Sequence, residues 1–144
     1  MGVDPLTPQA RSAQMARVKH SDTKPEMNAR RAAHRLGYRF RLHRRDLPGT
    51  PDMVFPRLRK IIMVNGCFWH QHEGCRRARL PKSRPEYWLP KLTRNKERDE
   101  QVIHALNALG WDILTLWECQ AKNVDAACAA IAPFLGAKAE RDGR

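Results

Sequence analysis

The chain has 144 residues, 42% of them hydrophobic, which suits one domain with one core. It contains no apolar run of about 18 residues, so a transmembrane helix is excluded. The first ten residues lack the apolar stretch of a secretory signal. We therefore expect a cytoplasmic protein without a membrane partner.

Positive charge is concentrated in the first two thirds of the chain. The 27 Lys and Arg residues outnumber the 15 Asp and Glu residues, giving a net charge of +12. Residues 1–98 hold 23 basic and 8 acidic residues, whereas residues 99–144 hold 4 and 7. This distribution favours a polyanion as partner, and nucleic acid is the first candidate. We therefore expect the protein to be associated with the nucleoid. A basic surface without a binding role is the alternative.

The N-terminal part of the chain predicts a basic arm followed by a helix. Residues 1–21 form the arm. The helix begins at Asp22 or Thr23, whose side chains are suited to cap it. It runs to Leu36 and is ended by Gly37, because glycine readily adopts the left-handed conformation that follows a helix.

Three short strands are expected next. Residues 38–43 alternate apolar and basic side chains, which is typical of a strand with one buried face. A Leu-Pro-Gly-Thr-Pro loop at 47–51 leads into a strand at 52–55. A turn at 56–59 then leads into a β-branched strand at 60–64.

The second half of the chain predicts a loop, a helix, a strand and a last helix. Residues 66–90 lack periodicity and are rich in Cys, His and aromatic residues. A helix is expected over 90–109, a strand over 111–118 and a helix over 123–135. This order indicates an α/β fold with a mixed central sheet flanked by helices. The expected organisation is an arm at 1–21, one domain at 22–135 and a polar tail at 136–144.

A group of cysteines and histidines has the composition of a zinc site. Cys67, His72 and Cys75 lie within nine residues, and Cys119 lies far downstream. Zinc prefers four such ligands in a tetrahedron, and a closed set of four is structural. The alternative is a pair of buried cysteines beside surface histidines.

Asp52 opens a strand after Pro51, a position at which many restriction-type nucleases place a Mg²⁺ ligand. Those enzymes also carry an acid and a lysine on the next strand. The segment 63–65 (Met-Val-Asn) offers neither. The Pro-Asp pair alone is equally compatible with an ordinary turn.

Three residues beside the cysteines suit work on DNA. Phe68 and Trp69 are adjacent bulky side chains in a basic surrounding, and such side chains wedge between bases in some complexes. They are equally suited to the core of a loop-rich region. His70 has the pKa range needed for proton transfer at a phosphodiester.

Short motifs follow one another along the chain in a specific order. They are LPGTPD at 47–52, NGCFWHQH at 65–72, YW at 87–88 with Lys91, NKERD at 95–99, GW at 110–111 and WEC at 117–119. Together with residues 15–26, they resemble the very-short-patch mismatch-repair (Vsr) endonuclease family over about residues 10–120. Two features differ from the family pattern: Asn65 replaces a common histidine, and the loop before Cys75 is one residue longer.

The resemblance implies a restriction-endonuclease-like fold with a structural zinc and a Mg²⁺-dependent reaction. Such an enzyme nicks the thymine strand 5′ of the mispaired T in a T:G mismatch, left by deamination of 5-methylcytosine. The expected partners are mismatched double-stranded DNA and mismatch-repair proteins. A monomer is expected, because a nick requires only one active site.

Carried over by position, the resemblance assigns a role to each site residue. Asp52 and the carbonyl of Val64 are Mg²⁺ ligands, and His70 handles the proton of the attacking water. Glu26 and Asp99 hold metal-bound waters. The remaining roles are zinc ligation by Cys67, His72, Cys75 and Cys119, insertion into the DNA stack by Phe68, Trp69 and Trp88, and groove contact by the arm at 1–21.

Two other functions remain open from the sequence. One is a nicking nuclease of the same fold that serves a restriction or defence system without mismatch preference. The other is a catalytically silent zinc module that binds nucleic acid. The silent module would need the cysteines and the basic face, but not Asp52, His70 and Asp99 together.

Overall fold

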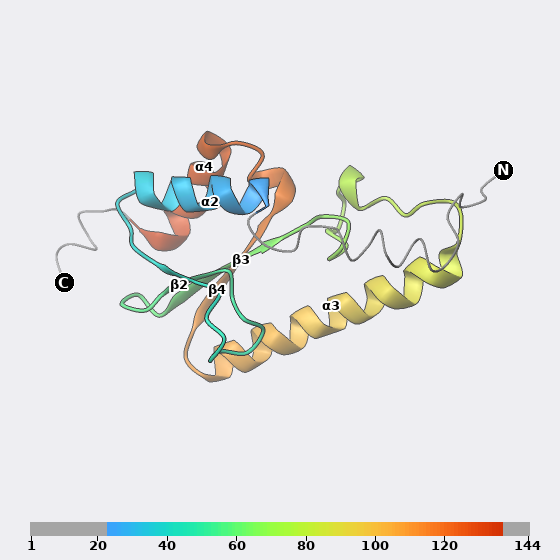
Figure 1. Cartoon of the computed structure of the whole chain (residues 1–144), viewed down its shortest axis with the longest axis horizontal. Helices are drawn as coiled ribbons and strands as arrows, with labels where there is room; N and C mark the ends of the chain where they lie inside the picture. The colour runs from blue at the N-terminus through green and yellow to red at the C-terminus, as the bar shows by residue number, and fades with distance from the viewer. Residues whose placement is uncertain (1–22, 137–144) are drawn as a thin grey trace.

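The structure is a computed structural model that describes residues 23–136 (Figure 1). The expected arm at 1–21 and all of the expected tail except Gly136 lie outside the described residues. Within the described range, no helix is both long and apolar enough to cross a membrane.

One mixed sheet of four strands, in the order β1-β2-β3-β4, forms the centre of the fold. The strands are β1 (Arg41–Leu42), β2 (Met53–Phe55), β3 (Lys60–Asn65) and β4 (Asp112–Trp117). The β1–β2 and β2–β3 pairs are antiparallel, whereas β3 and β4 are parallel. A parallel pair needs a long crossover, and helix α3 supplies it. The predicted α/β class with a mixed sheet is therefore confirmed.

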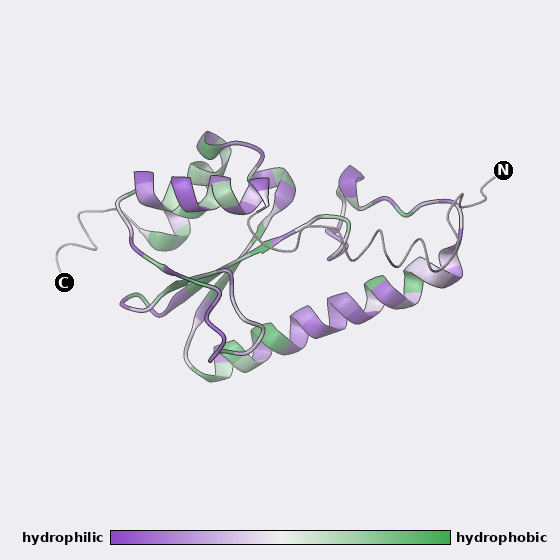
Figure 2. Cartoon of the chain, in the orientation of Figure 1, coloured by the Kyte–Doolittle hydropathy of each residue, from purple (hydrophilic) through white to green (hydrophobic). Residues whose placement is uncertain are grey.

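Helices cover both faces of this sheet (Figure 1). Helices α2 (Lys24–Arg35) and α4 (Val124–Leu135) lie on one face, and α3 (Pro85–Ala108) lies on the other. Short 3-10 helices occur at Arg76–Ala78 and Glu118–Gln120. Figure 2 shows the middle of α3 as largely hydrophilic, in the part that extends away from the sheet.

The two layers of core follow the twofold alternation of the strands. Ile62 packs with the alanines of α2 and with Ile131 of α4. Its neighbour Ile61 points the opposite way and packs with Leu106 and Trp111 beside α3. All three residues of β2 are buried, because helices cover both of its faces.

Helix α3 begins at Pro85, five residues before the predicted start at Pro90. Both prolines suit a first turn, and Pro85 is the one that occupies it. Trp88 and Leu92 are buried one turn apart, which holds the additional turn in place. Pro90 is exposed within the helix.

The strand predicted at 38–43 is shorter than expected, since only Arg41–Leu42 pair with β2. Tyr38 does not pair with β2; it is buried, and its hydroxyl donates to the carbonyl of Leu135 at 2.9 Å. Leu42, on the predicted apolar face, is 41% exposed. The alternation of apolar and basic residues at 38–43 therefore reflects the packing of Tyr38 and Phe40 against helices α2 and α4.

The loop that carries Asp52 is held against α3 at Gly49, where φ is +76°. A Cβ at this position would lie 2.5 Å from Cγ1 of Val102. Gly49→Ala should therefore lower the free energy of unfolding by about 2–4 kcal/mol, combining left-handed strain with overpacking. Denaturant unfolding measures this loss. Gly74→Ala is the control, because its φ is +71° and nothing lies within 4 Å of the added Cβ. Equal losses in the two variants would refute the packing argument.

Candidate functional site

The pairing of β3 with β4 brings two distant cysteines together. Asn65 is the register partner of Trp117, so the segments that follow β3 and β4 leave the sheet side by side. Two residues further on lie Cys67 and Cys119. The loop after β3 turns back, with the His72 N–H donating to the Cys67 carbonyl at 2.9 Å. Cys75 completes the group.

The four side chains fit a tetrahedral zinc ion. The ligand atoms of Cys67, His72, Cys75 and Cys119 all lie within 4.8 Å of one another. Nδ1 of His72 is 3.7 Å from Sγ of Cys67 and 3.5 Å from Sγ of Cys119. Zn–S bonds of about 2.3 Å and Zn–N bonds of about 2.0 Å require N-to-S edges of about 3.5 Å. The predicted ligands thus form a cluster consistent with a zinc site.

The surroundings of this cluster also favour a cation. Burial raises the pKa of the Cys67 thiol to about 12, so a thiolate there needs a positive neighbour. The His72 ring stacks on Trp117 with centroids 4.1 Å apart, which orients Nδ1. Glu118 accepts the Cys67 N–H at 3.2 Å.

A second cluster lies where α2, β1 and β2 begin or end. It consists of Glu26, His43 and Asp52, whose ligand atoms lie within 4.8 Å of one another. Glu26 is in the first turn of α2, and Asp52 immediately precedes β2. Oδ2 of Asp52 accepts the backbone N–H of Val64 at 2.7 Å, which places the carboxylate at the end of β3.

Charge is unbalanced in this second cluster. Burial and, to a smaller extent, the nearby Glu26 carboxylate raise the pKa of Asp52 to about 6, although the hydrogen bond from Val64 opposes this shift. Arg30 pairs with Glu26 at 3.3 Å and offsets part of the negative charge. Two carboxylates held together in a partly buried place are well suited to a divalent cation.

His70 and Asp99 form a dyad next to the cluster. Nδ1 of His70 lies 2.5 Å from Oδ2 of Asp99, which projects from α3. The His70 charge also acts on Asp52, lowering its pKa. An Asp–His pair of this kind fixes the ring and leaves Nε2 for proton transfer. The expected role of Asp99 in holding a metal-bound water stays a prediction.

One hollow of about 540 Å³ is lined by one member of each group, Glu26 and His70. Its lining includes Glu26, Val64, His70, Phe68 and Trp69. One predicted metal ligand, the predicted proton-transfer residue and two predicted DNA-contacting aromatics therefore face one space.

The three aromatic residues predicted to contact DNA pack on one another. Phe68 meets Trp69 and Trp88 edge to face, with centroids 5.1 and 5.3 Å apart. Phe68 and Trp69 are half-buried, whereas Trp88 is 8% exposed. Trp88 would have to leave this cluster to enter a DNA stack, so its predicted role stays a prediction.

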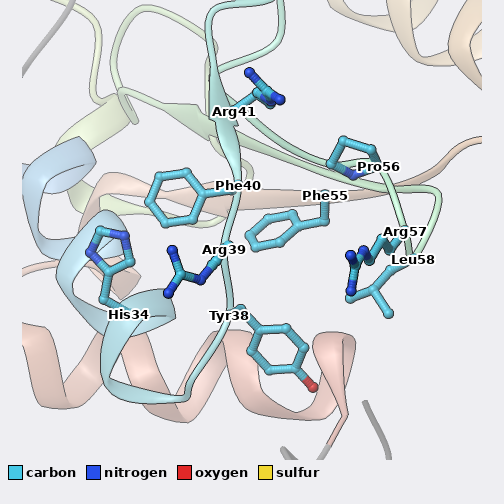
Figure 3. Close-up of a pocket in the computed structure, with 9 residues that line it drawn as sticks. All are labelled: His34, Tyr38, Arg39, Phe40, Arg41, Phe55, Pro56, Arg57 and Leu58. Carbon is cyan, nitrogen blue, oxygen red and sulfur yellow. The ribbon is translucent and has the colours of Figure 1, made fainter. Parts of the chain in front are cut away.

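A larger hollow of about 700 Å³ lies at the opposite end of α2 and β2 from Asp52 (Figure 3). Arg39, Arg41 and Arg57 line it, together with Phe40 and Phe55. Among the described residues that line it, none is acidic and none is a cysteine. It therefore lacks the carboxylates that line the smaller hollow.

His43 is the site residue that sequence reasoning missed. The pairing of Leu42 with Met53 puts His43 beside Asp52, and its N–H donates to the Asp52 carbonyl at 3.3 Å. An antiparallel pairing of 41–43 with 52–54 would have indicated this neighbour. The sequence alone does not define that register.

The chain is similar in sequence to known proteins. The family model described as DNA mismatch endonuclease Vsr matches residues 3–77. The type II nicking enzyme V.XorIIP of Xanthomonas oryzae pv. oryzae is 47% identical over 132 residues, covering 92% of this chain and 96% of that protein. A type II nicking enzyme of Neisseria meningitidis, V.NmeAIP, is 34% identical, covering 83% and 85%. The DNA mismatch endonuclease Vsr of Escherichia coli is 39% identical, covering 76% and 69%. The chain belongs to the Vsr family of DNA endonucleases.

Proposed function

We propose that this protein nicks one strand of duplex DNA with a divalent cation held at Asp52. The observation that carries the proposal is the hollow in which Glu26 and Val64 face His70, whose ring is held from behind by Asp99. The family match and the relatives named type II nicking enzymes support a nick rather than a double-strand cut. We extend this to a role in a restriction or defence system.

The chemistry follows from what phosphodiester hydrolysis requires. Mg²⁺, when bound, neutralises phosphate charge and stabilises the leaving oxygen. Asp52 and the Val64 carbonyl would hold it, with Glu26 positioning its waters. Nε2 of His70 would accept the proton of the attacking water, while Asp99 holds the opposite ring nitrogen at 2.5 Å. The histidine takes the place of the lysine that many restriction-type nucleases carry.

The second candidate is mismatch-specific nicking 5′ of the thymine in a T:G pair. The placement of Phe68 and Trp69 in the lining of the catalytic hollow favours it. A mismatched step costs less to open than a paired one, so aromatic side chains discriminate between them. In this reading, mismatch-repair proteins are the expected partners.

One comparison separates the two candidates. Duplexes of the same flanking sequence, differing only in T:G or T:A at one position, are incubated with the enzyme and Mg²⁺. Preferential nicking of the T:G duplex supports mismatch repair. Equal nicking supports an enzyme without mismatch preference. Binding of both duplexes without any nick would favour the silent zinc module.

Trp69→Ala should reduce nicking of a T:G duplex while leaving binding to a matched duplex within about twofold. Loss of one stacking contact removes roughly 1–3 kcal/mol, a five- to hundredfold effect on the opened complex. Steady-state nicking rates and a binding assay on matched DNA measure the two effects. A similar loss on both duplexes would instead mean that Trp69 acts only by packing within the aromatic cluster, without contacting the mismatch.

DNA affinity should depend steeply on salt. Residues 30–60 hold ten basic and two acidic residues, and residues 76–98 hold nine and two. We propose that these segments and the arm at 1–21 contact phosphates. Each neutralised phosphate then adds roughly 0.9 to the slope of log K against log salt. Binding measured across a salt series tests this, and a flat dependence would refute the proposed footprint.

A further inference from the structure

We propose that His43 is a third ligand of the catalytic cation and that it gives the site a preference for Mn²⁺ over Mg²⁺. The inference rests on the proposed cation site at Asp52 and deepens it. It concerns the metal that the site selects and a residue that the sequence reasoning did not assign.

The backbone brings His43 to the site and holds it in a strained conformation. Residue 43 follows β1 directly, and its N–H donates to the carbonyl of Asp52 at 3.3 Å. Its φ is +47°, which few residues other than glycine adopt. Such strain persists where surrounding structure enforces it, and it clusters at functional sites.

The ring nitrogen of His43 lies between the two carboxylates without bonding to either. Nε2 is 3.9 Å from Oε1 of Glu26 and 3.9 Å from Oδ1 of Asp52. Hydrogen bonds of this kind are about 2.7–3.2 Å long, so neither contact qualifies. Nε2 is nonetheless buried, and it has no hydrogen-bond partner among the residues that the structure describes. A buried nitrogen in that position is suited to a ligand role.

The spacing of the three atoms fits a common ion. In an octahedral site with bonds of about 2.1 Å, neighbouring ligand atoms are about 3.0 Å apart and opposite ones about 4.2 Å. Both distances from Nε2 fall between these limits. Small movements of the His43 and Asp52 side chains would bring Nε2 and Oδ1 into contact with one cation, and Glu26 would lie close enough to hold a water bound to it.

The donor set determines which cation is favoured. Mg²⁺ takes oxygen ligands almost exclusively, so an imidazole adds little to its binding. First-row transition ions accept nitrogen as well as oxygen, and Mn²⁺ is the member closest to Mg²⁺ in its preference for carboxylates. An imidazole added to the Asp52 carboxylate and the Val64 carbonyl therefore favours Mn²⁺ over Mg²⁺.

A plain ion pair is the competing explanation, and it makes the opposite prediction. A positively charged His43 that merely offset Glu26 and Asp52 would repel an incoming cation. Its removal would then tighten Mn²⁺ binding. Removal of a ligand weakens binding instead, so affinity alone distinguishes the two roles.

The test measures metal binding to the full zinc-loaded chain in the absence of DNA. Free Mn²⁺ is followed by its electron paramagnetic resonance signal, and Mg²⁺ is measured by competition. His43→Ala should raise the Kd for Mn²⁺ by roughly tenfold or more and change the Kd for Mg²⁺ by less than about threefold. His34→Ala, an exposed ring at the other end of α2, should change neither. Zinc content and thermal stability confirm that each variant is folded.

Asp52→Asn separates failure of this inference from failure of the proposed site. It should weaken the binding of both ions, because it removes a charged ligand. If Asp52→Asn weakens Mn²⁺ binding but His43→Ala leaves it unchanged or tighter, the role given to His43 is wrong. If neither variant alters Mn²⁺ binding, the cation site itself has been misplaced.

Discussion

Asp52→Asn is expected to abolish nicking while the protein keeps its fold and its zinc. The substitution preserves size and an acceptor for the Val64 N–H, now 2.7 Å from Oδ2. It removes the negative charge that a divalent cation requires. Replacing a residue that only supports a metal ligand typically lowers activity about 10–100-fold. Replacing the ligand itself should therefore lower the nicking rate by more than roughly a hundredfold. Nicking rates at saturating Mg²⁺ measure the effect.

The fold should tolerate this change for a physical reason. Burial already raises the pKa of Asp52 to about 6, which shows that the charged form is disfavoured where it lies. A neutral amide avoids that desolvation cost. Asp46→Asn is the matched control, because Asp46 is an exposed acid of the same loop that pairs with Arg44 at 2.5 Å. Wild-type activity in Asp52→Asn would show that the active site lies elsewhere.

Cys119→Ser should release zinc and destabilise the whole domain. A tetrahedral site that loses one thiolate loses most of its affinity, and metal affinity is folding free energy in such sites. The cluster ties the loop after β3 to the end of β4. The expected loss is several kcal/mol, which lowers Tm by on the order of 10 °C. Elemental analysis and thermal unfolding measure the two effects.

Cys128→Ser provides the comparison for this variant. Cys128 lies in α4, with Sγ 3.9 Å from the Ala32 carbonyl, and does not belong to the four-residue cluster. Its replacement should leave zinc content at one ion per chain and change Tm little. Wild-type protein purified without any zinc would contradict the zinc assignment.

Much of the fold could be predicted from the periodicity of apolar residues and from the residues that begin or end helices and strands. The order of helices and strands is as expected, because each element carries a local signal such as the Thr23 cap or the β-branched run of β3. Where two local signals competed, the prediction failed. Pro85 and Pro90 both suit a helix start, and only the burial of Trp88 decides between them.

The candidate site was predictable where chemistry alone identifies a residue. The four residues of the cluster consistent with a zinc site were identified because cysteine and histidine at short spacing are typical zinc ligands. His43 and the pairing of His70 with Asp99 were not, since both depend on which segments lie side by side. Asp99 is 29 residues from His70 in sequence, and a helix of 24 residues places it. Such contacts arise from the packing of α3 and from the register of a short hairpin.

Strand-specific cleavage by the wild-type enzyme decides whether this protein is a metal-dependent nicking enzyme. A duplex carrying a T:G pair and its matched counterpart are labelled at the end of either strand and incubated with Mg²⁺ or with a chelator. One labelled strand should be shortened while its complement stays intact, and only when the divalent cation is present. Cleavage of both strands, cleavage in the presence of chelator, or binding of every duplex without a nick would contradict it.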